Sequence, residues 1–298
     1  MKTAATIRSE EYSDWERNAE FYRADDHSLL MEKLAARRER YYGIRTGQRV
    51  LDIGCGTGAT VSRLRARGVD AVGIDFAPAM VEAAHREYAL EDHVHCAEAT
   101  NLPFASSSLD AVLANGVFHH LAVQGRLGDA LCEIHRVLKP GGRLCCFDRN
   151  GSVISGIMSE LCIRVKSTLR RITRRELFPS CASRNEIAFG GRRDLKTIRD
   201  CGFRMLHRRD ASSLPFFSCV VALNAIQYFL STHLRRRIEH RLCRVVSWVD
   251  THLAFHWLCV EQFVVFERNP LPGCAEVPSP KQNAEHHIKV AGFVPAMS

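Results

Sequence analysis

The chain has 298 residues, of which 46% are hydrophobic and 25% are charged, values that are ordinary for a globular protein. This length suffices for one large domain or two small ones, with a core that needs no metal or disulfide. The 12 cysteines include no C-x-x-C pair and no Cys/His cluster at zinc spacing, which argues against a disulfide scaffold and a metal site. Scattered free thiols favour a reducing, cytoplasmic compartment.

The net charge of +8 is concentrated in one part of the chain. Residues 151–250 carry 19 Lys/Arg and 8 Asp/Glu, a net charge of +11, which leaves −3 for the remainder. Such asymmetry is typical of an interaction surface. The first 22 residues contain no apolar central region, so we expect no secretory signal peptide.

In chain order, residues 11–42 have helical apolar spacing, and the polar stretch at 23–28 predicts a break into two helices. Strand and helix patterns then alternate. The predicted strands are 48–54, 70–75, 92–99, 108–116 and 143–149, and the predicted helices are 60–68, 77–89 and 126–142. This alternation predicts an α/β fold with a parallel sheet and right-handed crossovers.

The pattern changes after residue 148. Further helices are expected at 153–175, 194–203 and 235–250, and further strands at 203–211 and 256–268. The uncharged run at 214–230 is slightly short for a membrane span and contains Asn224 and Gln227, so we interpret it as a buried or interfacial helix. The Pro-rich tail from residue 269 is expected to be disordered.

Ligands of such a sheet bind at the carboxyl ends of its strands. This rule brings residues 52–58 to one crevice with Asp75, Glu98, Asn115 and Asp148. The stretch VLDIGCGTGAT at 50–60 has three alternate glycines, which allow a sharp turn and the close approach of a ligand. It also satisfies the dinucleotide pattern G-x-G-x-x-A, but the absence of G-K-[ST] excludes a P-loop.

Asp52 favours a cationic ligand over a pyrophosphate. It lies two residues before the first glycine, where a carboxylate would repel phosphate and attract an ammonium or sulfonium group. Asp75 ends the second predicted strand and can accept hydrogen bonds from both ribose hydroxyls, which fits NAD equally well. The residues alone therefore favour a cationic adenosyl ligand, with a dinucleotide as the alternative.

Four segments then resemble a known family: VLDIGCGTG, GIDFAPAMVEAA, AEATNLPFASSSLDAVLANGVFHHL and EIHRVLKPGGRL. Residues 45–148 are similar to class I S-adenosylmethionine-dependent methyltransferases of the small-molecule group, which includes the ubiquinone and menaquinone methyltransferases. The resemblance implies a Rossmann-like, seven-stranded, mostly parallel sheet with helices on both faces. We expect a helical lid at 1–44, a cofactor-binding core at 45–150, acceptor-binding helical insertions at 151–268 and a tail at 269–298.

The resemblance also implies S-adenosylmethionine as cofactor and assigns its contacts by position. The glycine loop and the end of the fourth strand would face the methionine moiety, Asp75 the ribose, and Phe76 and Glu98 the adenine. Phe76 as plain core and Glu98 as a surface acid are the alternatives. The cofactor-binding set is Asp52, Gly54, Cys55, Gly56, Gly58, Asp75, Phe76, Met80, Glu98, Ala99, Asn115 and Gly116.

Methyl transfer mainly needs alignment, and a base is needed only where the acceptor must lose a proton. His119 and His120 follow the fourth strand, where the acceptor should lie, and are the candidate bases; a structural role is the alternative. Tyr12, Tyr22 and Asp148 are candidate acceptor-binding residues. At Asp148 the chain reads DRN where relatives often have Glu, Pro and Asn, which puts an inherited role in doubt.

We expect transfer of a methyl group to O, C or N of a small, apolar or lipid-like metabolite. The basic helices at 153–175 and 235–250 are either solvated faces or a peripheral contact with an anionic substrate or membrane surface. Nucleic acid is disfavoured because no aromatic platform is interleaved with the charge. The alternatives are a module that binds the cofactor without methylating and a peripheral membrane scaffold. The sequence indicates no oligomeric state.

Overall fold

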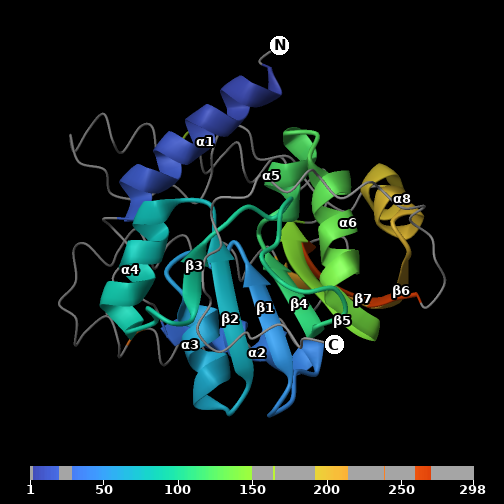
Figure 1. Ribbon diagram of the computed structural model, residues 1–298, viewed down its shortest axis with the longest axis horizontal. Coiled ribbons are helices and arrows are strands. Elements are labelled where there is room, and N and C mark those ends of the chain that lie inside the picture. Colours follow the sequence, from blue (N-terminus) through green and yellow to red (C-terminus); the bar gives the residue numbers. More distant parts are fainter. Residues whose placement is uncertain are drawn as a thin grey trace.

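The computed structural model describes residues 3–19, 29–149, 192–213 and 259–269, together with residues 164 and 238. Its centre is a seven-stranded sheet in the order β3-β2-β1-β4-β5-β7-β6 (Figure 1). The strands are β1 (Arg49–Ile53), β2 (Asp70–Asp75), β3 (Val94–Cys96), β4 (Leu109–Asn115), β5 (Leu138–Arg149), β6 (Phe203–Ser213) and β7 (Cys259–Arg268). Strand β7 is antiparallel to β5 and β6, and the pairs among β1–β5 are parallel. The predicted Rossmann-like, mostly parallel sheet is confirmed.

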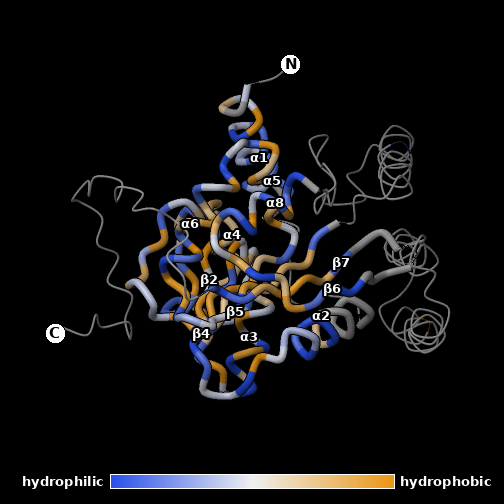
Figure 2. Tube along the Cα trace, turned by 90° about the vertical axis from the view of Figure 1, so that its right-hand side faces the viewer, coloured by the Kyte–Doolittle hydropathy of each residue, from blue (hydrophilic) through white to orange (hydrophobic). Residues whose placement is uncertain are grey.

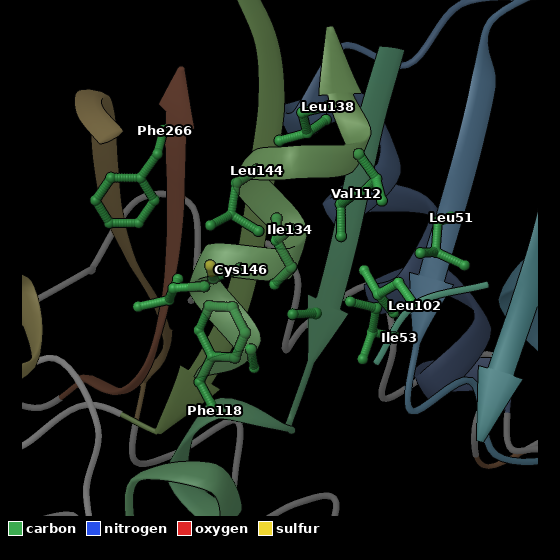
Figure 3. Packing of buried hydrophobic residues seen from close by; sticks show 14 of the residues in the cluster. Leu51, Ile53, Leu102, Val112, Phe118, Ile134, Leu138, Leu144, Cys146 and Phe266 are labelled. Atoms are coloured by element: carbon green, nitrogen blue, oxygen red, sulfur yellow. The ribbon is translucent and has the colours of Figure 1, made fainter. Parts of the chain in front are cut away.

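Helices cover both faces of this sheet, because successive side chains of a strand point to opposite faces and both sets are apolar. The helices are α1 (Ala4–Asn18), α2 (Leu29–Tyr42), α3 (Ala59–Ala66), α4 (Pro78–Tyr88), α5 (Phe118–Val123), α6 (Leu127–Val137) and α8 (Arg192–Asp200). Leu51 and Val112 belong to the core cluster that includes residues of α5, α6 and α8 (Figure 3). Val50 and Leu113 belong to a second cluster with residues of α2, α3 and α4. Hydrophobic residues accordingly concentrate along the central strands (Figure 2).

Some predicted boundaries are wrong for identifiable reasons. The first helix begins at Ala4 rather than at residue 11, since Thr3 caps it through a 3.2 Å hydrogen bond from the Thr6 N–H to its hydroxyl. Helix α6 ends at Val137, and residues 138–142 belong to β5 instead. Strand β3 spans three residues rather than 92–99, because its last partner, Asp75, ends β2. The short helix α5 was not predicted as an element.

Several predicted segments lie outside the described residues: 20–28 with Tyr22, the run at 214–230, the tail beyond 269, and the basic helices at 153–175 and 235–250 apart from residues 164 and 238. The helix expected at 194–203 is α8, and the strands expected at 203–211 and 256–268 are β6, at the edge of the sheet, and β7. Among the described residues, no helix is long and apolar enough to cross a membrane.

Strands β1 and β4 lie side by side, and the sheet order runs outward from them in both directions. A crevice forms at such a switch point, above the carboxyl ends of the strands. Residues of α1 line a cavity at this end of the sheet. In Figure 1, α1 lies above the sheet. The fold therefore brings an N-terminal helix, the loop after β1 and the start of α5 to one place.

Candidate functional site

A cavity of about 290 Å³ lies at the carboxyl ends of β1, β2 and β4. Its lining unites most of the site residues predicted from the sequence, which come from segments far apart in the chain. These are Gly54, Cys55, Gly56, Asp75, Phe76, Met80, Glu98, Ala99, Asn115, Gly116 and His120. The expectation that the strand ends meet at one crevice agrees with this arrangement.

Of the predicted site residues that the structure describes, five do not line the cavity. Asp52 and Asp148 are buried, each at most 3% exposed, and so is His119 at 6%. Gly58 precedes the first residue of α3. Tyr12 is 41% exposed, and its ring centroid lies 6.1 Å from that of Phe76.

Two glycines of the loop after β1 serve different purposes. Gly58 has φ +76°, and a Cβ on it would lie 2.6 Å from Leu90 Cδ1 and 3.1 Å from Ala84 Cβ, so it allows close packing on the core. Gly56 has φ +54° and would place a Cβ in open space, with no atom of a described residue beyond its chain neighbours within 4 Å. Because Gly56 also lines the cavity, its bare backbone is accessible to a ligand.

The carboxylate of Asp75 is held by backbone donors. Its Oδ2 accepts a hydrogen bond from the Gly56 N–H over 2.9 Å, and its Oδ1 accepts one from the Ala77 N–H over 3.0 Å. Burial raises the pKa of Asp75, and these hydrogen bonds counteract the rise. The acid therefore fixes the glycine loop to the end of β2 and also faces the cavity.

Asp52 lies behind the cavity wall and acts on it through Asn115. The Tyr42 hydroxyl donates to Asn115 Oδ1 over 2.9 Å, and Asn115 Nδ2 donates to Asp52 Oδ1 over 3.4 Å. Burial raises the pKa of Asp52 to about 7, although Arg38, Arg63 and the Asn115 hydrogen bond lower it. A cation near this carboxyl would favour its ionised form.

Glu98 lies between two arginines rather than standing free. Arg8 of α1 donates to its Oε1, and Arg126 Nη1 donates to its Oε2 over 2.9 Å. Arg126 Nη2 also donates to Thr100 Oγ1 over 2.6 Å. These contacts connect α1 and the segment before α6 to the chain that follows β3.

His119 points away from the cavity toward β5. Its Nδ1 lies 2.8 Å from Asp148 Oδ1, and its backbone N–H donates to Asp148 Oδ2 over 3.2 Å. Neither ring nitrogen makes a well-directed hydrogen bond to a described residue. The pair therefore connects the first turn of α5 to the end of β5.

His120 lines the cavity and contacts α1. Its Nδ1 lies 3.0 Å from Glu11 Oε1, and Gln124 Nε2 donates to Glu11 Oε2 over 2.5 Å. The Trp15 ring is edge-on to the His120 ring, with 6.1 Å between the ring centroids, and the centroid of the His119 ring lies 3.9 Å from that of His120. Of the two candidate bases, only His120 reaches the cavity.

Glu11 is the main site residue that sequence reasoning missed. It is 2% exposed and lies among other acids in the stretch SEEYSDWERN, from which residue type alone does not distinguish it. Its spacing does: Glu11, Trp15 and the buried C-cap residue Ala19 recur every four residues and so lie on the same side of α1. The predicted helix at 11–42 includes Glu11, but the spacing does not indicate its partner, His120, which lies 109 residues away in the chain.

Comparison with known proteins agrees with the fold and the motifs. Residues 51–146 match the family model described as a methyltransferase domain. Demethylmenaquinone methyltransferase of Clavibacter sepedonicus is 42% identical over 100 residues, which are 33% of this chain and 40% of that protein. The 27-O-demethylrifamycin SV methyltransferase of Amycolatopsis mediterranei (strain S699) is 35% identical over 144 residues, which are 45% of this chain and 52% of that protein.

Among solved structures, the [4+2]-cyclase SpnF has a similar fold, with a TM-score of 0.50 and 20% identity over 80% of this chain and 81% of that one. The matched residues span about half or less of the length of the two curated relatives described above. Within that span, the resemblance to class I S-adenosylmethionine-dependent methyltransferases, including the menaquinone enzymes, is confirmed.

Proposed function

We propose that the protein transfers a methyl group from S-adenosylmethionine to a small, largely apolar acceptor, because residues 51–146 match a methyltransferase domain. One observation carries this proposal: a single cavity joins the glycine loop and Asp75 to His120. The cofactor supplies an activated methyl group on a sulfonium sulfur, so the protein's task is alignment, desolvation and, where needed, removal of a proton.

The residues present fit this cofactor. Gly56 and Gly116 line the cavity with open space where a Cβ would be, so backbone can approach a ligand there. In the proposed complex, Asp75 accepts hydrogen bonds from the ribose hydroxyls and Phe76 contacts the adenine. Asn115, oriented by Asp52, faces the cationic methionine end.

Glu98 has a smaller role in the proposed binding of the cofactor than the resemblance implies. Both of its carboxylate oxygens accept hydrogen bonds from arginines, which leaves its remaining lone pairs for an adenine amine. We propose that Ala97 and Ala99, which line the cavity on either side of Glu98, contribute the surface on which the adenine packs.

The acceptor end of the cavity supports a largely apolar substrate. Trp15, Val117 and Leu121 line it beside His120 and Gln124, so an apolar body would be buried next to one polar, proton-accepting side. Tyr12 and Asp148 do not line the cavity, and their contact with an acceptor stays a prediction. A peripheral membrane contact through residues 153–175 and 235–250 is not part of the proposal, since the structure describes only one residue of each segment.

The fold alone does not decide between methyl transfer and another activity, because one protein of similar fold is named a [4+2]-cyclase. The test is calorimetric binding of S-adenosylmethionine followed by measurement of S-adenosylhomocysteine release with a panel of lipophilic hydroxylated acceptors. Binding together with release that depends on an acceptor supports the proposal. Tight binding without release from any acceptor would favour the non-methylating module.

A further inference from the structure

We infer that Glu11 of α1 is a positioning residue for His120, and that this pair forms the proton-accepting group of the site. The inference rests on the proposed function and deepens it, since it selects one of two adjacent histidines and adds a carboxylate from a separate helix. It starts from geometry: Glu11 is 2% exposed, and its Oε1 lies 3.0 Å from His120 Nδ1.

The carboxylate of Glu11 determines the tautomer of His120. An ionised carboxylate only accepts hydrogen bonds, so the 3.0 Å contact requires the proton of the neutral imidazole to be on Nδ1. Gln124, the C-cap residue of α5, donates from Nε2 to the second oxygen over 2.5 Å and orients the carboxylate. His120 Nε2 then carries the lone pair, and it makes no hydrogen bond to any described residue.

The cavity gives this lone pair a function. His120 and Glu11 both line it, together with Trp15, whose ring restrains the imidazole edge-on at 6.1 Å. His119 lacks these features, because it is buried toward Asp148 and does not line the cavity. A carboxylate behind an imidazole that faces a cavity is the arrangement of a general base.

The acceptor in this step carries an ionisable O–H, N–H or C–H bond. The proton passes to His120 Nε2 while the freed electron pair of the acceptor atom forms the new bond to the methyl carbon. The carbon–sulfur bond breaks, and its electron pair stays on sulfur, which becomes a neutral thioether. The imidazolium formed on His120 is stabilised by Glu11, and its proton later leaves to solvent.

The charged and titratable groups around His120 come from three elements. Glu11 faces it from α1, His119 adjoins it on α5, and Asp148 of β5 lies behind His119. Arg8 and Arg126 line the same cavity but bind Glu98. Among these groups, Glu11 is the carboxylate in contact with the His120 ring.

The first test needs no acceptor and uses the full chain labelled with ¹⁵N-histidine. Long-range ¹H–¹⁵N spectra, assigned with His120→Gln, should show His120 as the Nδ1–H tautomer. Glu11→Gln should lose this preference, whereas Glu16→Gln should keep it. Glu16 is the matched control, because its carboxylate also extends from α1 to another segment, where it accepts the Ala79 N–H over 3.2 Å. An Nε2–H tautomer in the unchanged protein, or the same tautomer in Glu11→Gln, would overturn the inference.

The second test uses the acceptor that gives turnover in the panel. Glu11→Gln should lower kcat by about 10- to 100-fold, and His120→Gln by about 10²- to 10⁴-fold, with the dissociation constant of S-adenosylmethionine unchanged in both. The double variant should be no slower than His120→Gln alone, because Glu11 acts through His120. Effects that multiply would contradict the inference. If the unchanged protein did not bind S-adenosylmethionine, the proposed function would be refuted, but the tautomer result would still stand.

Discussion

Asn115 at the end of β4 donates a hydrogen bond to Asp52 at the end of β1, with 3.4 Å between Nδ2 and Oδ1. The acceptor is a buried carboxyl whose pKa is raised by burial to about 7, so it is only partly ionised at neutral pH. A cationic ligand beside Asn115 selects the ionised form. Binding should therefore lower this pKa and release a proton.

The first prediction is the pH dependence of this binding. Because the ligand prefers the carboxylate, the dissociation constant of S-adenosylmethionine should rise as the pH falls below about 7, by up to about tenfold per pH unit. The ligand's amino group stays protonated in this range, since the pKa of an α-amino group is about 7.7–8.0. Calorimetry between pH 5.5 and 7 in buffers of different ionisation enthalpy measures both the affinity and the released proton.

Asp52→Asn provides the matched comparison for that experiment. The amide of this variant can still accept the Asn115 hydrogen bond, but it does not titrate. The affinity of the variant for S-adenosylmethionine should therefore be weak and independent of pH over the same range. A dissociation constant that varies with pH equally in both proteins would assign the titration to another group. Equal affinity of the variant and the unchanged protein at pH 7 would remove Asp52 from the site.

The second prediction concerns Asp75, whose carboxylate accepts from the Gly56 and Ala77 N–H groups and faces the cavity. Asp75→Asn removes the charge that strengthens hydrogen bonds from ribose hydroxyls, so it should weaken cofactor binding by about 10- to 100-fold, corresponding to about 1.5–3 kcal/mol. Asp70→Asn is the control, because Asp70 lies at the opposite end of the same strand and is exposed. If both variants bound the cofactor as tightly as the unchanged protein does, the ribose assignment would be wrong.

A site residue can be predicted from the sequence where its position depends on the local pattern of its own strand or helix. The strand-end residues Asp75 and Asn115 could be assigned because strand periodicity places them, and the parallel topology then brings them to one edge. Glu11 could not, since its role depends on how α1 docks against α5, a contact between segments 109 residues apart. The same limit applies to Glu98, whose arginine partners come from two other parts of the chain.

The third prediction compares two glycines with positive φ, to distinguish the effect of a substitution on ligand binding from its effect on backbone strain. Gly56→Ala and Gly47→Ala each place a Cβ at φ +54° and +79°, respectively, where the described part of the chain has no atom within 4 Å other than the neighbouring residues. Both should lose about 1–2 kcal/mol of unfolding free energy, the cost of an alanine in the left-handed region. Only Gly56→Ala should also lose cofactor affinity, because only Gly56 lines the cavity. Unaltered affinity in Gly56→Ala would show that the ligand does not approach this backbone.

Gly58→Ala extends the series as a fourth prediction, now on packing. Its Cβ would lie 2.6 Å from Leu90 Cδ1 and 3.1 Å from Ala84 Cβ, and Ala84 has no side-chain rotation with which to retreat. The overpacking should add about 1–3 kcal/mol to the backbone cost seen at Gly47. Denaturant unfolding measures the difference, and a Gly58→Ala protein as stable as Gly47→Ala would mean that the loop relaxes without strain.

The fifth prediction concerns the attachment of α2 to α3 beneath the site. The Glu39 side chain, 5% exposed, accepts from Arg63 Nε over 2.9 Å and from Arg67 Nη1 over 3.0 Å. Glu39→Ala leaves two arginines beside an apolar core, but their side chains are 30% and 43% exposed and can turn to water. We therefore expect the free energy of unfolding to fall by about 1–2 kcal/mol, which is less than the full cost of breaking a buried pair. Asp200→Ala, which removes the exposed Lys196 pair on α8, should change stability by less than about 0.5 kcal/mol. Equal unfolding free energies for the two variants would show that burial of the Glu39 carboxylate contributes nothing to holding α2 in place.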